Sequence, residues 1–151
     1  MRRIALLATA VGILTITAAA AAVAAPVGHT ARTTTIQLRH TGAGTILTTG
    51  TGRTIYVFTR DRHNRDMCAA VSGCTSVWPL VTSSARPAAG RGVSTRLLGT
   101  IRVGGARQVT YGGRPLYTYR GDTGPGETSY IGISQFGGSW YGLTSQGKIV
   151  R

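Results

Sequence analysis

Acidic residues are scarce in this sequence, which has four Asp and Glu among 151 residues but 17 Lys and Arg. The chain therefore has few carboxylates that could act in pairs as catalytic acid and base. The two cysteines are too few for a disulfide-dense scaffold. No stretch beyond residue 25 combines helical length, helical period and caps, which excludes a helical bundle. Because no Gly-x-Ser-x-Gly or other catalytic signature occurs, we expect neither enzymatic activity nor a cofactor.

The one long uncharged run lies at the N-terminus, over residues 4–25, directly after two arginines. It ends in Ala22-Val23-Ala24-Ala25, the kind of small residues at which signal peptidase cuts. We predict a helical signal peptide over residues 1–25 and a polar tether over 26–35. The alternative is a retained membrane anchor, because 22 uncharged residues can span a bilayer. No cysteine near the cut offers a lipid-anchor site, so we expect a secreted or envelope-associated protein.

The basic charge limits the partners of the exported chain. Cleavage after Ala25 would leave 15 basic and four acidic residues, a net charge of 15 − 4 = +11. Such a charge favours anionic envelope polymers or lipid headgroups. Nucleic acid is not expected, because the arginines are dispersed, no reading motif occurs and export removes the chain from the genome. The excess of Arg over Lys is equally typical of a GC-rich genome.

Cys68 and Cys74 enclose five residues in the segment CAAVSGC. In an exported protein this spacing favours one local disulfide that fixes a turn. The alternative is a redox or metal pair, for which Cys-x-x-Cys is the usual spacing.

Short alternating runs separated by glycine-containing breaks fill the rest of the chain, as in antiparallel hairpins. Gly104-Gly105 and Gly112-Gly113 are two-residue turn signals between such runs. The segment 82–95 is rich in Pro, Gly and Ala, which favours a mobile connector. The predicted strands cover residues 34–39, 46–47, 55–58, 97–103, 107–111, 115–119, 139–143 and 148–150.

One block of sequence occurs twice, as GRTIYVFTRD at 52–61 and GRPLYTYRGD at 113–122, with an offset of 61 residues. Each copy contains Tyr-x-aromatic-x-x-Asp, and a tryptophan follows each after a similar gap. Such repetition indicates one supersecondary unit used twice, each copy covering apolar surface of the other. The repeated residues are Tyr56, Phe58, Asp61 and Trp78 in the first copy, and Tyr117, Tyr119, Asp122 and Trp140 in the second.

These paired blocks resemble the bacterial "secreted repeat of unknown function" family, also described as predicted lipoproteins with a Yx(FWY)xxD motif. The resemblance covers about residues 36–151 and includes the Cys-x5-Cys pair, Trp78-Pro79-Leu80 and the closing FGGSWY. It implies an exported, envelope-associated protein of unassigned function. Many members carry a lipid anchor, for which this chain lacks the cysteine.

Asp61 and Asp122 allow two interpretations. They could act as the acid and base of a glycoside hydrolase. We favour a structural role, in which each aspartate ends a strand and accepts hydrogen bonds from the following turn, because a motif used twice is better explained by architecture than by one asymmetric active site.

The motif aromatics could line a sugar-stacking groove, but aromatics on strands are more often core residues, and we expect core. Asp61, His63 and Asp66, with the two cysteines, are the candidate residues of the alternative metal or redox site.

The prediction is an all-β domain of two related antiparallel units, packed through their aromatic faces and clipped by one disulfide. The units cover about residues 36–81 and 96–151, joined by the connector 82–95. The expected function is a non-enzymatic binding or scaffolding module for anionic surface material. The alternative is an envelope accessory protein linked to metal or redox chemistry.

Overall fold

Short strands, one helical turn and the loops between them make up residues 32–151, the part of the chain that this computed structural model describes. The predicted signal peptide and most of the predicted tether lie outside these residues. The elements are β1 (Thr35–Thr41), β2 (Gly44–Thr49), β3 (Tyr56–Phe58), α1 (Cys74–Val77), β4 (Ala88–Ala89), β5 (Leu98–Val103), β6 (Ala106–Tyr111), β7 (Arg114–Pro115), β8 (Ser134–Gln135), β9 (Gly138–Leu143) and β10 (Ile149–Val150).

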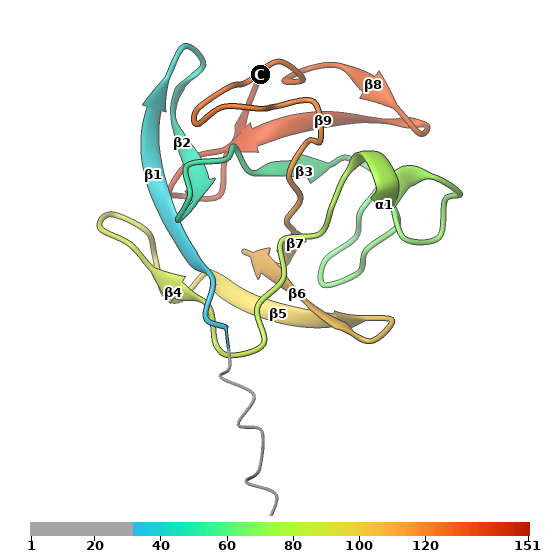
Figure 1. Cartoon of the computed structure of the whole chain (residues 1–151), viewed down its shortest axis with the longest axis horizontal. Helices are drawn as coiled ribbons and strands as arrows, with labels where there is room; N and C mark the ends of the chain where they lie inside the picture. The colour runs from blue at the N-terminus through green and yellow to red at the C-terminus, as the bar shows by residue number, and fades with distance from the viewer. Residues whose placement is uncertain (1–31) are drawn as a thin grey trace, which may run out of the picture.

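The strands form three small sheets that surround a common core (Figure 1). Their strand orders are β2-β1-β4, β10-β9-β3 with β8 added to β9, and β5-β6-β7. Every named pair is antiparallel except β1 and β4, which run parallel. The predicted all-β architecture of two related antiparallel units is confirmed.

Each repeat begins with a tight hairpin, β1–β2 in the first and β5–β6 in the second. The second hairpin turns at Gly104-Gly105, as predicted, and Gly104 has φ 56°. Only glycine adopts this backbone region without a steric cost. Gly104 stands 62 positions after Gly42 of the first turn, so the two hairpins superpose in sequence.

The two repeats exchange their last strands. β3 of the first repeat pairs with β9 of the second, in the register Phe58↔Trp140. Conversely, residues 116–120 of the second repeat pair with 77–81 of the first, through hydrogen bonds such as Thr118 N to Pro79 O at 3.0 Å. Each repeat therefore completes the sheet of the other, a closer relationship than packing side by side.

The two motif strands meet at Tyr56 and Tyr117. The amide of Tyr56 donates to the carbonyl of Tyr117 at 2.9 Å, and the reverse bond measures 3.0 Å. This reciprocal pair marks the centre of an approximate two-fold relation between the repeats. Equivalent residues of the two copies therefore lie on opposite sides of an axis that passes between Tyr56 and Tyr117.

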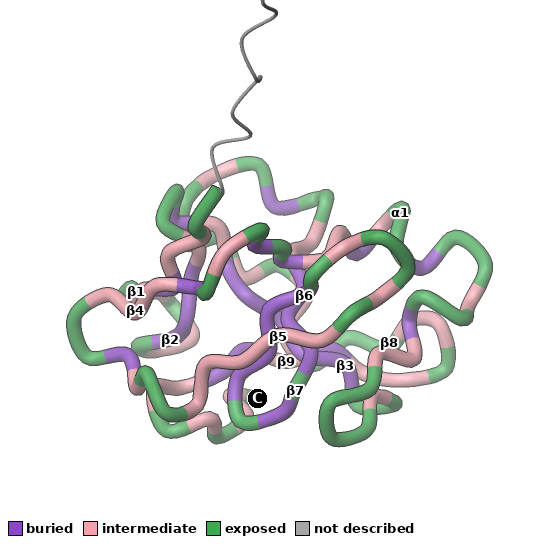
Figure 2. Tube along the Cα trace, turned by 90° about the horizontal axis from the view of Figure 1, so that it is seen from below, coloured by how far each residue is buried: buried purple, intermediate pink, exposed green. Residues whose placement is uncertain are grey.

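Alternation along β3 divides the core into two clusters, because neighbouring side chains on a strand point to opposite faces. Figure 2 shows the buried positions gathered at the centre and the exposed ones at the loop ends. The aliphatic cluster contains Ile36, Leu47, Ile55, Val57, Val81, Val93, Val109, Tyr111, Leu116 and Leu143. The aromatic cluster contains Tyr56, Phe58, Trp78, Tyr117 and Trp140, together with Cys68 and Cys74.

The connector 82–95 differs from the expectation of mobility. Its β4 extends the first sheet, with Thr35 opposite Ala88, and its Val93 is buried in the aliphatic cluster. The pairing and the burial fix this segment, although its composition resembles that of a linker. The structure also contains one helical turn, α1, that the sequence did not predict. Four residues are too few to show a helical period.

Candidate functional site

The motif tyrosine of each repeat donates to the motif aspartate of the other. The Tyr56 hydroxyl lies 2.6 Å from Asp122 Oδ2, and the Tyr117 hydroxyl lies 2.9 Å from Asp61 Oδ2. The exchange of strands produces this crossing, because it places each tyrosine beside the turn that follows the opposite motif strand. The two motifs thus form one hydrogen-bonded assembly.

Each aspartate has a second donor. Asp122 Oδ1 accepts from the Ser129 hydroxyl, and Asp61 Oδ1 accepts from the amide of Met67 at 2.7 Å. Asp61 therefore caps the following turn as expected, whereas Asp122 bonds hydroxyl groups. Asp122 is only 1% exposed. All four carboxylate oxygens of the motif thus have partners inside the protein.

Burial shifts the protonation of these groups. It raises the pKa of Asp61 to about 7, because desolvation outweighs the hydrogen bonds from Met67 and Tyr117 that favour the carboxylate. Burial, reinforced by the neighbouring aspartates, raises the pKa of both Tyr56 and Tyr117. The tyrosines consequently remain donors throughout the physiological range.

Four aromatic rings form a column through the centre of the molecule. Trp78 and Trp140 stack with centroids 3.6 Å apart, and Phe58 continues the column on Trp140 at 4.3 Å. Tyr119 lies tilted on the other face of Trp78 at 4.8 Å. Both tryptophans are fully buried and Phe58 is 2% exposed, so these three rings form core and cannot stack on a sugar, while Tyr119 at the end of the column is half-buried.

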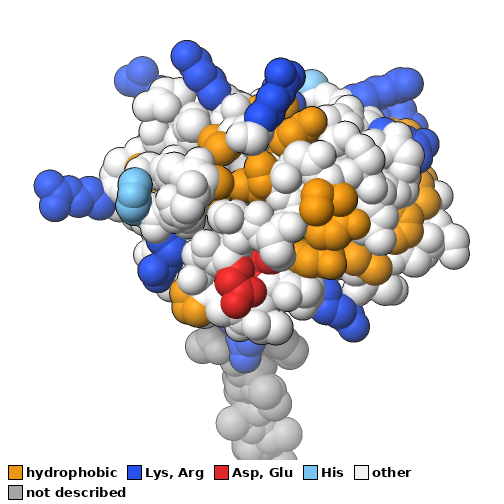
Figure 3. Space-filling view, turned by 90° about the horizontal axis from the view of Figure 1, so that it is seen from above, with side chains coloured by type: hydrophobic (Ala, Val, Ile, Leu, Met, Phe, Trp, Pro, Cys, Tyr) orange, Lys and Arg blue, Asp and Glu red, His pale blue; other side chains and the backbone are white. Residues whose placement is uncertain are grey.

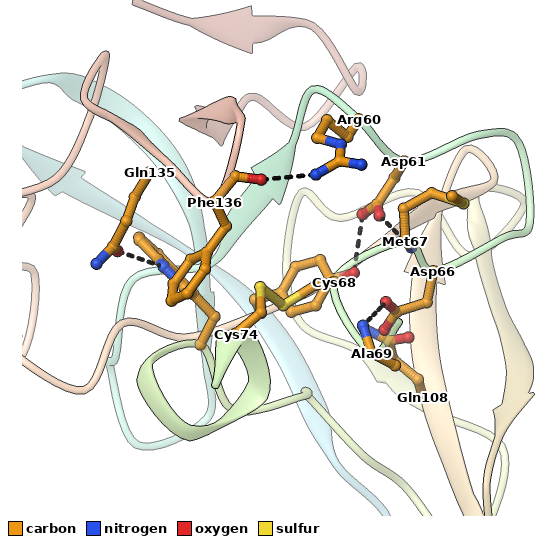
Figure 4. The surroundings of a disulfide bond; sticks show 12 residues. Arg60, Asp61, Asp66, Met67, Cys68, Ala69, Cys74, Gln108, Gln135 and Phe136 are labelled. Carbon is orange, nitrogen blue, oxygen red and sulfur yellow. Dashed lines mark hydrogen bonds between the residues drawn. A yellow bond between two sulfur atoms is a disulfide. The ribbon is translucent and has the colours of Figure 1, made fainter. Parts of the chain in front are cut away.

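The predicted disulfide between Cys68 and Cys74 is present, with Cα atoms 5.5 Å apart. Figure 4 shows it beside Asp61 and Asp66, whose carboxylates accept hydrogen bonds from the amides of Met67 and Ala69. Cys74 also begins α1, which leads directly into Trp78. The disulfide therefore fixes the loop that delivers Trp78 to the aromatic column.

The structure does not gather the candidate metal ligands Asp61, His63 and Asp66 around one point. Both oxygens of Asp61 have partners, and the ring of His63 packs on the backbone of Gly113, where an added Cβ would lie 2.1 Å away. Asp66 Oδ2 is buried and has no hydrogen-bond partner. Among residues 32–151, no three His, Cys, Asp or Glu side chains gather as metal ligands.

The surface is strongly asymmetric in charge. Fourteen of the fifteen Lys and Arg side chains in residues 32–151 are exposed, and Arg53 is half-buried. Of the four carboxylates in the same residues, Glu127 alone is exposed. Figure 3 shows basic side chains spread around the outline of one face and acidic atoms in one small area. Asp122 is buried and Asp61 and Asp66 are half-buried, whereas every basic side chain of these residues except Arg53 is exposed.

The sequence identified the motif residues but not which of them pair. The sequence also gives no indication of the roles of Ser129, which donates to Asp122, and Gln135, whose Oε1 accepts from Trp78 Nε1 at 3.0 Å. Both lie in a stretch of the second repeat without a recognisable pattern. No signal in a single sequence distinguishes them from other polar loop residues.

Comparison with known families agrees with this geometry. A family model described as "secreted repeat of unknown function" matches residues 38–82 and again 100–144, more than half of the chain. No curated protein and no solved structure matches the chain. Within the part of the chain that the structure describes, no helix is long and apolar enough to cross a membrane. Two matched copies, in the order of the two observed repeats, establish that this chain belongs to the family of secreted repeats of unknown function.

Proposed function

We propose that this protein is a non-enzymatic binding or scaffolding module of the cell envelope and that its partners are anionic surface polymers. One observation carries the proposal: residues 32–151 expose fourteen basic side chains and one carboxylate. A field of one sign raises the local concentration of oppositely charged polymers and accelerates their association.

The hydrogen bonds of the arginines support this role. Arg60 donates to the carbonyl of Phe136 at 2.8 Å, and Arg53 donates to the carbonyl of Tyr119. A carbonyl partner orients a guanidinium without neutralising it. The exposed Arg60 consequently keeps its charge available to an external anion, whereas Arg53 is half-buried.

The internal hydrogen bonds of the motif aspartates support a role without catalysis. A general acid or base must come within hydrogen-bond reach of a substrate. Asp122 is buried and bonds Tyr56 and Ser129, while Asp61 bonds Tyr117 and Met67. A hydrolase that uses these carboxylates would have to break four internal hydrogen bonds before reaching its substrate.

The test is a binding titration of the exported protein with poly(glycerol phosphate), with polygalacturonate, and with neutral dextran. We expect both anionic polymers to bind at low salt, dextran not to bind, and affinity to fall as NaCl rises toward 0.5 M, where screening extends over only about 4 Å. Equal binding of dextran, or affinity independent of salt, would contradict the proposal. A separate titration with vesicles that carry anionic lipid headgroups tests whether lipids, rather than polymers, are the partner.

The second candidate is a metal- or redox-linked accessory protein that uses the loop from Asp61 to Cys74. It rests on the closeness in sequence of Asp61, His63, Asp66 and the two cysteines, which the structure does not gather as metal ligands within residues 32–151. Intact mass and metal content of the exported protein separate the candidates. Stoichiometric metal or two free thiols would favour the second.

A further inference from the structure

Two arginines face each other across the second hairpin. Arg102 on β5 and Arg107 on β6 are direct register partners, and both are exposed. Directly opposite residues of an antiparallel pair share one face of the sheet, and like charges in such positions repel each other. The position therefore favours an external anion that can neutralise both guanidinium groups.

The pair borders a hollow of about 310 Å³. The wall opposite the hairpin consists of Thr82, Ser83 and Ser84, which follow the last strand of the first repeat. Ser83 N donates to Arg107 O at 3.0 Å and so ties this wall to the hairpin. Two cationic forks and a row of hydroxyl-bearing residues thus surround one space.

Arg107 is already oriented. One of its terminal nitrogens lies 3.2 Å from Thr100 Oγ1, and the other lies 3.4 Å from the carbonyl of Ser84. Neither partner carries a charge, so these contacts hold the guanidinium beside the hollow and leave its charge uncompensated. Preorganisation of this kind reduces the entropic cost of binding.

The first repeat provides an internal comparison. At the equivalent positions of the β1–β2 hairpin, His40 faces Thr45, and their side chains lie 3.3 Å apart in hydrogen-bond contact. In the first hairpin the two facing side chains hydrogen-bond each other. In the second hairpin the two facing side chains are both cations and are exposed to solvent. Since the hairpins are otherwise alike, architecture alone does not require the arginine pair.

We propose that the hollow between Arg102, Arg107 and the Thr82–Ser84 segment binds a phosphodiester group of a polyol phosphate polymer. A phosphodiester carries two free oxygens and one permanent negative charge, and guanidinium forks match such oxygens closely. Thr82 is exposed on the wall of the hollow, and its hydroxyl suits a polyol unit beside the phosphate, whereas the Ser83 and Ser84 hydroxyls already bond the carbonyl of Arg32. This inference rests on the proposed function and assigns it one site.

The experiment measures the affinity of the exported protein for poly(glycerol phosphate) at fixed salt. Arg102→Gln/Arg107→Gln is compared with the matched control Arg91→Gln/Arg96→Gln, which removes the same charge from exposed positions outside this hollow. We expect the first variant to lose about tenfold or more, because charge-assisted hydrogen bonds are lost, and the control to lose about threefold or less through the general field. Arg102→Lys/Arg107→Lys keeps the charge without the forks and should lie between them. Circular dichroism and the Tm confirm that each variant is folded.

The outcomes separate the site from the general function. Equal losses in the two glutamine variants would overturn the site and leave the proposed function intact. Absence of polymer binding by the wild type would overturn the proposed function. The site is then tested alone by NMR titration with dimethyl phosphate: shifts of the Arg102–Arg107 amides uphold it, and their absence overturns it. Binding only to phosphatidylglycerol vesicles would overturn a polymer as the ligand.

Discussion

Trp78 of the first repeat and Trp140 of the second stack face to face, with ring centroids 3.6 Å apart and planes 3° from parallel. Their indole nitrogens differ. Trp78 Nε1 donates to Gln135 Oε1 at 3.0 Å, whereas Trp140 Nε1 is buried without a partner. The backbones of the two repeats are therefore related by an approximate two-fold axis, but only one of the two equivalent indole N–H groups has a hydrogen-bond partner.

Replacing each tryptophan with phenylalanine should reveal this asymmetry. Both changes remove similar volume, but Trp78→Phe also breaks a hydrogen bond and leaves Gln135 unpaired, whereas Trp140→Phe removes an unsatisfied N–H. We expect Trp78→Phe to lower the free energy of unfolding by about 1–2 kcal/mol more than Trp140→Phe. Urea denaturation measures both. As a control, Gln135→Met should destabilise the wild type but not Trp78→Phe.

The bond from Tyr56 to Asp122 should contribute more than its counterpart in the other motif. Tyr56→Phe leaves a fully buried carboxylate oxygen without that donor, and we expect a loss of about 1–3 kcal/mol. Tyr117→Phe should cost less, because Asp61 is half-exposed and water can replace the lost donor. Asp122→Asn should also lower stability, because the amide offers one acceptor oxygen to two hydroxyl donors and its NH2 group cannot accept the second bond. A double-mutant cycle of Tyr56→Phe with Asp122→Asn should give a coupling above about 0.5 kcal/mol, and strict additivity would contradict a direct bond.

Stability should fall as pH rises between about 4 and 7. Burial raises the pKa of Asp61 from 3.8 in the unfolded chain to about 7 in the folded protein. Between these two pKa values the folded state binds more protons than the unfolded state. The contribution of Asp61 to the free energy of unfolding is therefore complete below pH 3.8 and is lost as the pH rises through about 7. Asp61→Asn should flatten this dependence in urea titrations from pH 4.5 to 8. Hydrogen bonds from the amides of Gly124 and Thr123 lower the pKa of Glu127 from 4.5, so this group affects stability only below about pH 4.5, outside the range of the urea titrations.

The disulfide should stabilise the domain modestly. The loop it closes is short, because the two cysteines are six positions apart. Loop-closure entropy then predicts a loss of about 2 kcal/mol for Cys68→Ala/Cys74→Ala, with the β fold retained by circular dichroism. Complete unfolding of this variant at 25 °C would show that the loop has a larger part in building the aromatic cluster.

Much of the fold was predictable because its signals are local. The predicted strand at 55–58 has a period of two, which puts Tyr56 and Phe58 on one face and Ile55 and Val57 on the other. The structure places these pairs in the aromatic and aliphatic clusters. The Gly104-Gly105 turn follows from the same kind of local chemistry. Cys68 and Cys74 had no other cysteine to pair with.

The crossing of the motifs was not predictable from one sequence. Tyr56 precedes Asp61 by five positions and Asp122 by 66, and the motif spacing is the same whichever aspartate it bonds. The choice depends on which distant strand covers β3, a property of the assembled core. Val93 illustrates the same limit, since one apolar residue within a linker-like segment gives no periodic signal and is nevertheless buried.

The exchange of last strands also determines when the protein can fold. β3 has no partner in its own half of the chain, because β9 lies about 80 residues further along. A chain emerging N-terminus first would carry the first motif strand unpaired until nearly its whole length was available, and contacts so distant in sequence form slowly. A single repeat could close its sheets only by borrowing a strand from a second copy. The molecule is, in effect, a strand-swapped dimer whose halves are tied together, so loss of the final strands would leave the first half open as well.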